Sequence, residues 1–192
     1  NNANGLLWRR ITRYFLAFFL ILLGTEAYSQ INRQFEVKTF TNLTDTNSNG
    51  IVDDGDVVNF TIRVENTGNI TLNSLVLSST FIGLDSSVIN LSSGINYANS
   101  SESSGSGTLI AGEIETYIAS YTFSNIGSTG GISLSILGQA VSADSQQVSD
   151  TSDNANNSDG NTTDDPNIIT AGDSVASIEI DKVFDRYEDV DG

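Results

Sequence analysis

The sequence predicts an all-β fold: an Ig-like antiparallel β-sandwich preceded by an N-terminal signal-peptide helix. Three observations lead to this prediction. Short segments rich in β-branched and aromatic residues alternate apolar with polar side chains, as strands with one buried face do. Clusters of Gly, Asn, Asp and Ser separate these segments at roughly even spacing, which is typical of a sandwich. Residues 1–29 differ from the rest because they join arginines to an unbroken apolar run.

Residues 1–29 have the composition of an export signal. A basic segment with three arginines precedes the apolar run Tyr14–Leu23, and the small residues Ala27 and Ser29 mark a cleavage site before Gln30. The run is too short for a hydrocarbon core, which needs about 20 apolar residues. We therefore expect a secreted product without a membrane span in its mature chain. An anchor that is not cleaved is the alternative.

Composition excludes several classes of function. The chain of 192 residues carries 24 acidic and 8 basic side chains, a formal net charge of −16, so a basic face for nucleic acid is not available. It has neither Cys nor His, which excludes disulfides, thiolate or His-ligated zinc, and Ser-His-Asp or Cys-His nucleophile systems. We expect no catalytic residues, no organic cofactor and no enzymatic activity. The absence of Met predicts that the sequence is either a fragment of a longer protein or an open reading frame extended upstream of its start.

Seven segments after residue 30 have the pattern of strands. They are Phe35–Phe40, Val57–Asn66, Ile70–Phe81, Val88–Leu91, Glu113–Phe123, Ile132–Ala140 and Ile168–Thr170. The third segment should be irregular near Asn73 and Ser74, where its apolar spacing shifts. Asn99–Gly107 is rich in Ser and Gly and predicts a flexible polar loop. The aromatic residues in the strand segments are expected to form the core.

The segment Asp45–Asp56, DTNSNGIVDDGD, has the spacing of a calcium-binding loop. Side-chain oxygens fall at loop positions 1, 3, 5, 9 and 12, which are Asp45, Asn47, Asn49, Asp53 and Asp56. Gly50 at position 6 permits a sharp turn, and Ile51 at position 7 would offer its backbone carbonyl. Strand patterns on both sides show that the segment is not an EF-hand. Ca²⁺ at these six residues is one prediction, and a turn without metal is the other, since Asn, Asp and Gly are common turn residues.

A second acidic stretch, Ser149–Asp165, predicts either a solvated, disordered loop or a second loop ordered by a cation. Beyond it, Ile178–Gly192 repeats the pattern of Phe35–Gly50, with Lys38 and Lys182 lying 144 residues apart. The predicted organisation is therefore a signal peptide over 1–29, a sandwich module over 30–172, and the start of a second, truncated repeat over 173–192.

Two motifs resemble a known family. The run from Gly55 to Asn69 and the acidic loop before Asp164-Asp165-Pro166 are similar to DUF11-like and related DUF7507-type repeats of large surface adhesins in Bacteroidota and other bacteria. The resemblance covers about Phe35–Thr170. It implies an Ig-like sandwich repeated in tandem on a long secreted protein, often exported by the type IX system and associated with the outer membrane. It implies a stalk or adhesive role and no reaction.

The sequence therefore predicts a structural or adhesive repeat module, stabilised by calcium, that acts as a spacer at the cell surface. Its partners would be neighbouring repeats of the same chain and a surface glycan or protein. The alternative is a carbohydrate-binding module in which exposed tyrosines stack on sugar rings, the candidates being Tyr97, Tyr117 and Tyr121. A hydrolase with paired carboxylates is the least favoured, because the acids lie in Asn- and Gly-rich loops.

Overall fold

The computed structural model describes residues 29–161 and 163–175, and the chain divides into two units, Asn1–Ile31 and Asn32–Gly192. The predicted signal peptide and nearly all of the predicted second repeat lie outside the described residues. No helix within the described ranges has the length and hydropathy that crossing a membrane requires. Every described strand belongs to the second unit.

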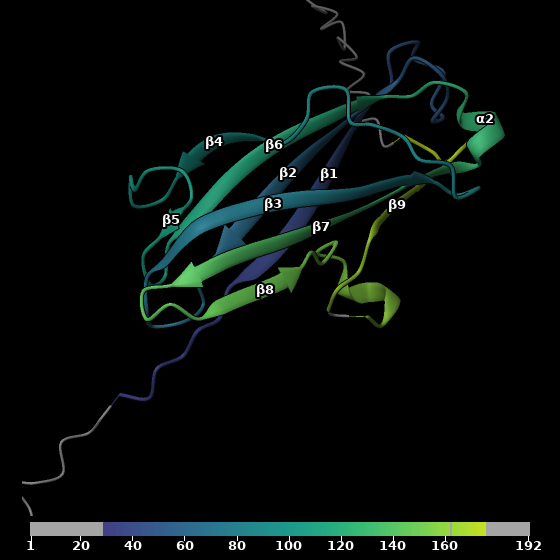
Figure 1. Ribbon diagram of the computed structural model, residues 1–192. Coiled ribbons are helices and arrows are strands. Elements are labelled where there is room, and N and C mark those ends of the chain that lie inside the picture. The colour runs from purple at the N-terminus through teal and green to yellow at the C-terminus, as the bar shows by residue number, and fades with distance from the viewer. Residues whose placement is uncertain (1–28, 162, 176–192) are drawn as a thin grey trace, which may run out of the picture. The chain divides into compact units, whose positions relative to one another are not determined.

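Two antiparallel sheets face each other in this unit (Figure 1). The first sheet has the order β1-β2-β6-β4, with bounds Glu36–Thr44, Val57–Glu65, Ile114–Thr122 and Asn96–Ser100. The second has the order β5-β3-β7-β8, with bounds Thr108–Leu109, Leu72–Gly83, Gly131–Ser142 and Gln147–Thr151. β9 (Asn167–Thr170) also pairs with β7, and the remaining elements are the short helix α2 (Ile126–Thr129) and a 3-10 turn over Asn157–Asp159.

The strand order is that of an immunoglobulin domain. If β1, β2, β3, β4, β6, β7 and β8 take the letters A to G, the sheets read A-B-E-D and C-F-G, which is the arrangement of a constant-type Ig sandwich. β5 and β9 are short additions at the edges of the C-F-G sheet. The predicted all-β, Ig-like antiparallel sandwich is confirmed.

The core is made by alternate residues of the strands, as the sequence pattern predicted. In β2 the buried positions are Val58, Phe60, Ile62 and Val64. The ring of Phe81, from the second sheet, lies edge-on to Phe60 and Tyr121 of the first, with ring centroids 6.2 and 5.0 Å apart. The chain has no cysteine and so lacks the disulfide that joins the two layers in many Ig domains, and these aromatic contacts contribute to holding the layers together instead.

The structure refines two predicted segments. The irregularity near Asn73 and Ser74 is a break in register between β3 and β7, where the partner shifts between Asn73 and Val76 and Ser74 adopts a φ of 55°. This bulge returns the apolar residues of β3 to the core face. The predicted strand at Val88–Leu91 is wrong: the structure has only an isolated bridge between Val88 and Ile82 of β3. Val88 is 83% exposed, so its side chain has no buried face to hold a longer pairing in place.

Replacing Phe81 with alanine should destabilise the sandwich by about 3–5 kcal/mol, because it leaves a cavity at the contact between the sheets. The free energy of unfolding in urea measures this loss. Phe40→Ala is the matched control, since the Phe40 side chain lies on the outer face and is 37% exposed. A cost for Phe81→Ala no larger than that for Phe40→Ala would contradict the role of Phe81.

Candidate functional site

The predicted calcium loop connects β1 to β2 at one end of the sandwich. Its first carboxylate, Asp45, accepts hydrogen bonds from the backbone N–H groups of Ser48 (2.6 Å) and Gly50 (2.7 Å). Gly50 has a φ of +81°, a conformation that side chains rarely adopt. Asp45 and Gly50 therefore form the turn together.

Three more of the predicted ligands contact one another. The Asn47 side-chain amide donates to Asp53 Oδ1 at 2.9 Å, and the Asn49 amide donates to Asp53 Oδ2. The amide oxygens of Asn47 and Asn49 accept from the backbone N–H groups two residues further on, at 3.0 and 2.9 Å. The second of these donors is Ile51, whose backbone was the predicted position-7 ligand. Asp53 thus lies between two amide groups that partly balance its charge.

Asp56 lies apart from this cluster. It is only 1% exposed, and its carboxylate accepts from the Thr46 backbone N–H (2.8 Å), the Thr46 hydroxyl (3.2 Å) and the Asp53 backbone N–H (3.1 Å). Burial alone would raise the pKa of Asp56, but these three hydrogen bonds outweigh burial and hold the pKa below its ordinary value. Asp56 fastens the two ends of the loop to each other.

The donor set fits a hard cation in chemistry, because carboxylate and amide oxygens are what Ca²⁺ prefers. Asp45, Asn47, Asn49 and Asp53 would hold the ion, with the two amides turned so that oxygen rather than nitrogen meets it. Asp56 would not bind the ion but would hold the two ends of the loop together through its hydrogen bonds with Thr46 and Asp53. Among the described residues there is no group of three Asp, Glu, His or Cys side chains placed to hold a metal. Calcium at the six predicted positions stays a prediction.

The second acidic stretch is fixed at its start to the free edge of β1. Asp150, in β8, accepts from the Val37 backbone N–H at 2.7 Å. The backbone of Asp153 then runs beside β1, accepting from the Thr39 N–H (2.8 Å) and donating to the Val37 carbonyl (3.0 Å). Just beyond the stretch, the side chain of Asn167 in β9 donates to the Thr39 carbonyl at 3.1 Å. The start of the stretch and Asn167 therefore act together as a strand partner for β1.

Burial raises the pKa of Asp150, the hydrogen bond from Val37 lowers it, and the nearby charges of Asp164 and Glu36 raise it further; the net shift is upward. Between Asp153 and Asp159 the side chains bind the backbone of their own loop. Asp153 accepts from the Ala155 N–H at 3.1 Å, and Asn154 accepts from the Asn156 N–H at 2.7 Å. These are turns of the Asx kind, which a cation is not needed to form.

Two buried carboxylates were not predicted from the sequence. Glu113 and Glu115 are both fully buried. Glu113 accepts from the hydroxyls of Ser100 and Ser104 and from the Ile110 N–H (2.7 Å). Burial would raise the pKa of Glu113, but these bonds outweigh it and lower the pKa. The alternation that turns Tyr117 inward continues back to both glutamates, so the register alone placed them in the core.

The predicted flexible loop at Asn99–Gly107 is fastened by these glutamates. Asn99 and Ser100 belong to β4, and the Gly107 N–H donates to Glu115 at 2.8 Å. On its other oxygen Glu115 accepts from the Tyr117 hydroxyl at 2.5 Å. Burial and this hydrogen bond raise the pKa of Tyr117 well above its ordinary range. The loop thus has fixed attachments at both ends.

The tyrosines proposed for sugar stacking have different positions. Tyr117 and Tyr121 are 8% and 6% exposed and belong to the core, so the prediction that they are exposed is wrong. Successive residues of a strand point to opposite faces, and Ile118, which is 51% exposed, lies on the outer face of β6. Tyr117 and Tyr121 therefore point into the core. Tyr97 is 39% exposed and lies edge-on to Tyr117, with centroids 5.6 Å apart. A single tyrosine of the three can face a ligand.

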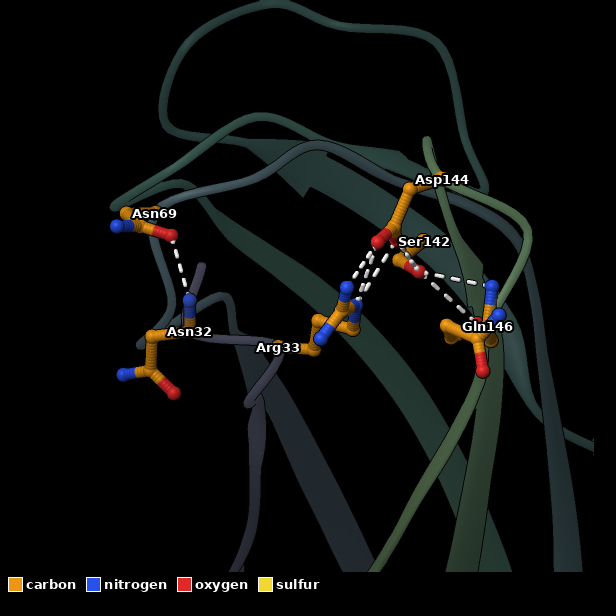
Figure 2. Close-up of polar contacts among 6 residues, drawn as sticks. All are labelled: Asn32, Arg33, Asn69, Ser142, Asp144 and Gln146. Atoms are coloured by element: carbon orange, nitrogen blue, oxygen red, sulfur yellow. Dashed lines mark hydrogen bonds and ion pairs between the residues drawn. The ribbon is translucent and has the colours of Figure 1, made fainter. Parts of the chain in front are cut away.

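The chain joins the sandwich at one end through a set of polar contacts (Figure 2). The Asn32 N–H donates to the Asn69 side chain at 2.8 Å, and the Arg33 guanidinium pairs with both oxygens of Asp144. Ser142 adds a hydroxyl bond to Asp144 at 2.5 Å. The Arg33 and Ser142 hydrogen bonds hold the pKa of Asp144 well below its usual range. Arg33 thereby attaches the incoming segment to the β7–β8 turn.

The segment by which the chain leaves the sandwich is hydrogen-bonded to the predicted calcium loop. The Val52 N–H donates to the Asp173 carbonyl (2.8 Å), the Gly172 N–H to the Val52 carbonyl (2.9 Å), and the Val175 N–H to the Gly50 carbonyl (3.1 Å). The segment 172–175 is therefore a strand-like partner of Gly50–Val52, although the sequence indicated a linker from Ala171. The residues that follow Ala171 are of the kind common in turns, and nothing in their sequence predicts that their backbone pairs with Gly50–Val52.

A scan against protein-family models finds no match, and searches of curated proteins and of solved structures also find none. The candidate site is therefore defined by the residues of this chain alone. The DUF11-like resemblance stays an expectation from sequence.

The hydrogen bonds to Asp56 predict a pH-dependent loss in the variant Asp56→Asn. The folded-state pKa is depressed, so the carboxylate contributes its stability above the ordinary pKa of about 3.9. That contribution disappears as the pH falls through the lowered folded-state value. At pH 7 the variant should lose about 1.5–3 kcal/mol, the range for hydrogen bonds to a charged group, and the gap should close in strong acid.

Urea unfolding from pH 7 to pH 2 measures both effects. Glu102→Gln is the control, since Glu102 is exposed and its loss should change stability little at any pH. An Asp56→Asn deficit that stays constant over this range would show that the carboxylate charge is not what stabilises the loop.

Proposed function

We propose that this chain is a structural module of a secreted or surface-attached protein, a spacer in a tandem array whose first loop binds calcium. The observation that carries the proposal is the position of its two ends. The incoming segment at Asn32–Gln34 is bound at one end of β1, and the leaving segment at 172–175 is bound beside the loop that follows the other end.

The two attachments lie at opposite ends of the sandwich (Figure 1). β1 has nine residues, so at about 3.3 Å per residue it separates them by about 30 Å. A module with ends arranged in this way adds its own length to a chain of modules. Binding modules need no such arrangement, because their function depends on a ligand surface.

The proposed calcium site lies at the end of the sandwich where the chain leaves it. The loop that would hold the ion is the loop whose Gly50 and Val52 pair with the leaving segment. An ion bound by Asp45, Asn47, Asn49 and Asp53 would order this loop and with it the junction to whatever segment comes next. Binding to the folded state alone would add RT ln(1 + [L]/Kd), about 2.7 kcal/mol at a hundredfold excess over Kd.

One specific observation supports the alternative function, carbohydrate binding. A cavity of about 300 Å³ lies between the outer face of the first sheet and the acidic stretch. It is lined by Phe40, by the charged residues Glu36, Lys38, Arg63 and Glu65, and by Ala155 and Asn157. Ligand pockets combine aromatic side chains with a few polar groups, and Phe40 beside these charged residues is such a combination. Loss of binding to a glycan array on Phe40→Ala would favour this function over the spacer.

Pulling the chain by its two ends tests the spacer function. Residues 32–175 should unfold in one event, and 144 residues at about 3.3–3.6 Å each give a length gain of roughly 450–500 Å after the folded length is subtracted. A module that loses its order gradually, at forces too low to produce a discrete event, would not serve as a spacer under load.

Calcium should raise the melting temperature of the wild type by several degrees relative to chelator, and Asp53→Ala should abolish the rise. Asp53 is the informative position because its partners are exposed amides, so the variant should melt like the wild type in chelator. Asp45→Ala would lose stability in both conditions, because Asp45 holds two backbone N–H groups without metal.

The melts need equal ionic strength, with Mg²⁺ and NaCl as references, because any cation screens a charge of −16. Glu102→Ala controls for loss of a carboxylate elsewhere. An identical shift in wild type and Asp53→Ala would remove calcium from this loop and leave the spacer function in place.

A further inference from the structure

The second sheet is almost free of charge in a chain that is otherwise strongly acidic. The sequences of its five strands contain a single charged residue, Asp150. Asp150 pairs with Gly138, a core position, and its side chain turns toward β1. The outer face formed by β3, β7, β8 and β9 therefore carries no charged side chain.

Cross-strand register shows what this face offers instead. One row across β3, β7 and β8 is Val76, Gln139 and Ser149, and the next is Ser78, Leu137 and Thr151. These are hydroxyl, amide and aliphatic groups. Val76 is 60% exposed, Leu137 38%, and Ile168 of β9 59%. β3, β7 and β8 lie side by side, and β9 pairs with the other half of β7 (Figure 1).

The outer face of the first sheet is different. Glu36 lies opposite Glu65, and Lys38 opposite Arg63, on neighbouring strands. Glu36 and Lys38 also form an ion pair at 2.8 Å. Any partner that covers this face must remove four charged groups from water, which costs free energy unless each finds a counter-charge. Of the charged residues that lie in strands, those with side chains on an outer face therefore all belong to the first sheet.

We propose that the uncharged outer face of the second sheet is the surface through which two copies of this chain associate side by side. Two molecules that each carry −16 repel each other. Contact through this face buries no charged side chain of the strands, so it removes no strand carboxylate or cation from water. Val76, Leu137 and Ile168 supply the aliphatic area, and the Ser, Thr and Gln groups supply hydrogen bonds.

The proposal goes beyond the spacer function, because it requires neither calcium nor a tandem array. It also predicts an unusual dependence on salt. Salt screens the repulsion between the acidic surfaces but has no ion pair to weaken at the contact. Association should therefore become stronger as salt increases, whereas an interface made of salt bridges would become weaker.

Sedimentation velocity of the full chain, over a concentration series at 20 and 500 mM NaCl, tests this directly. The wild type should associate, and more tightly at the higher salt. Val76→Lys should weaken association at least tenfold. Because the new lysine lowers the net negative charge, greater repulsion between molecules cannot explain such a loss.

Ile118→Lys is the matched control. Ile118 is 51% exposed on the outer face of the first sheet, and this variant carries the same N-terminal segment and the same new charge. It should associate like the wild type. Ile168→Lys provides a second test on the proposed face, and thermal melts show that each variant is folded.

Two results would overturn the proposal. One is a wild type that stays monomeric at both salt concentrations, including the case in which the same face binds a neutral polysaccharide instead. The other is equal weakening by Val76→Lys and Ile118→Lys.

Discussion

The free edge of β1 must be closed, and the rest of the sandwich depends on how this is done. An open strand edge exposes N–H and carbonyl groups to water and to other strands. Here the Asp150 carboxylate, the Asp153 backbone and the Asn167 amide satisfy the N–H and carbonyl groups of Val37 and Thr39. These partners belong to or come directly after the second sheet, so the closure of one edge also joins the two layers.

The chain compensates its acidity mainly through hydrogen bonds. The residues that the structure describes include two ion pairs, at Arg33 and Lys38. The buried carboxylates of Asp56 and Glu113 receive N–H and O–H donors instead of cations. Each of them fastens a loop: Asp56 the loop after β1, and Glu113 the loop after β4. Acidic residues thus hold the loops in place through hydrogen bonds, a role that disulfides have in many small extracellular domains.

Much of the fold could be predicted from the sequence, because alternation in segments such as Val57–Asn66 and Glu113–Phe123 reports a buried face directly. The contacts between distant segments could not. Nothing in the sequence around Asp153 shows that its backbone pairs with Thr39, since backbone bonds carry no side-chain signature. Asp56 is a related case: spacing placed it among the predicted ligands, whereas three donors from Thr46 and Asp53 hold it in the base of the loop.

Amide hydrogen exchange at Val37 and Thr39 tests the closure of the β1 edge most directly. Both N–H groups face away from β2, toward the acidic segment, and donate to Asp150 and Asp153. The account predicts that they exchange as slowly as amides in the centre of β2, and that Asp150→Ala speeds exchange at Val37. Rapid exchange at both positions in the wild type would show that the acidic segment is a solvated loop, and the closure described here would then be wrong.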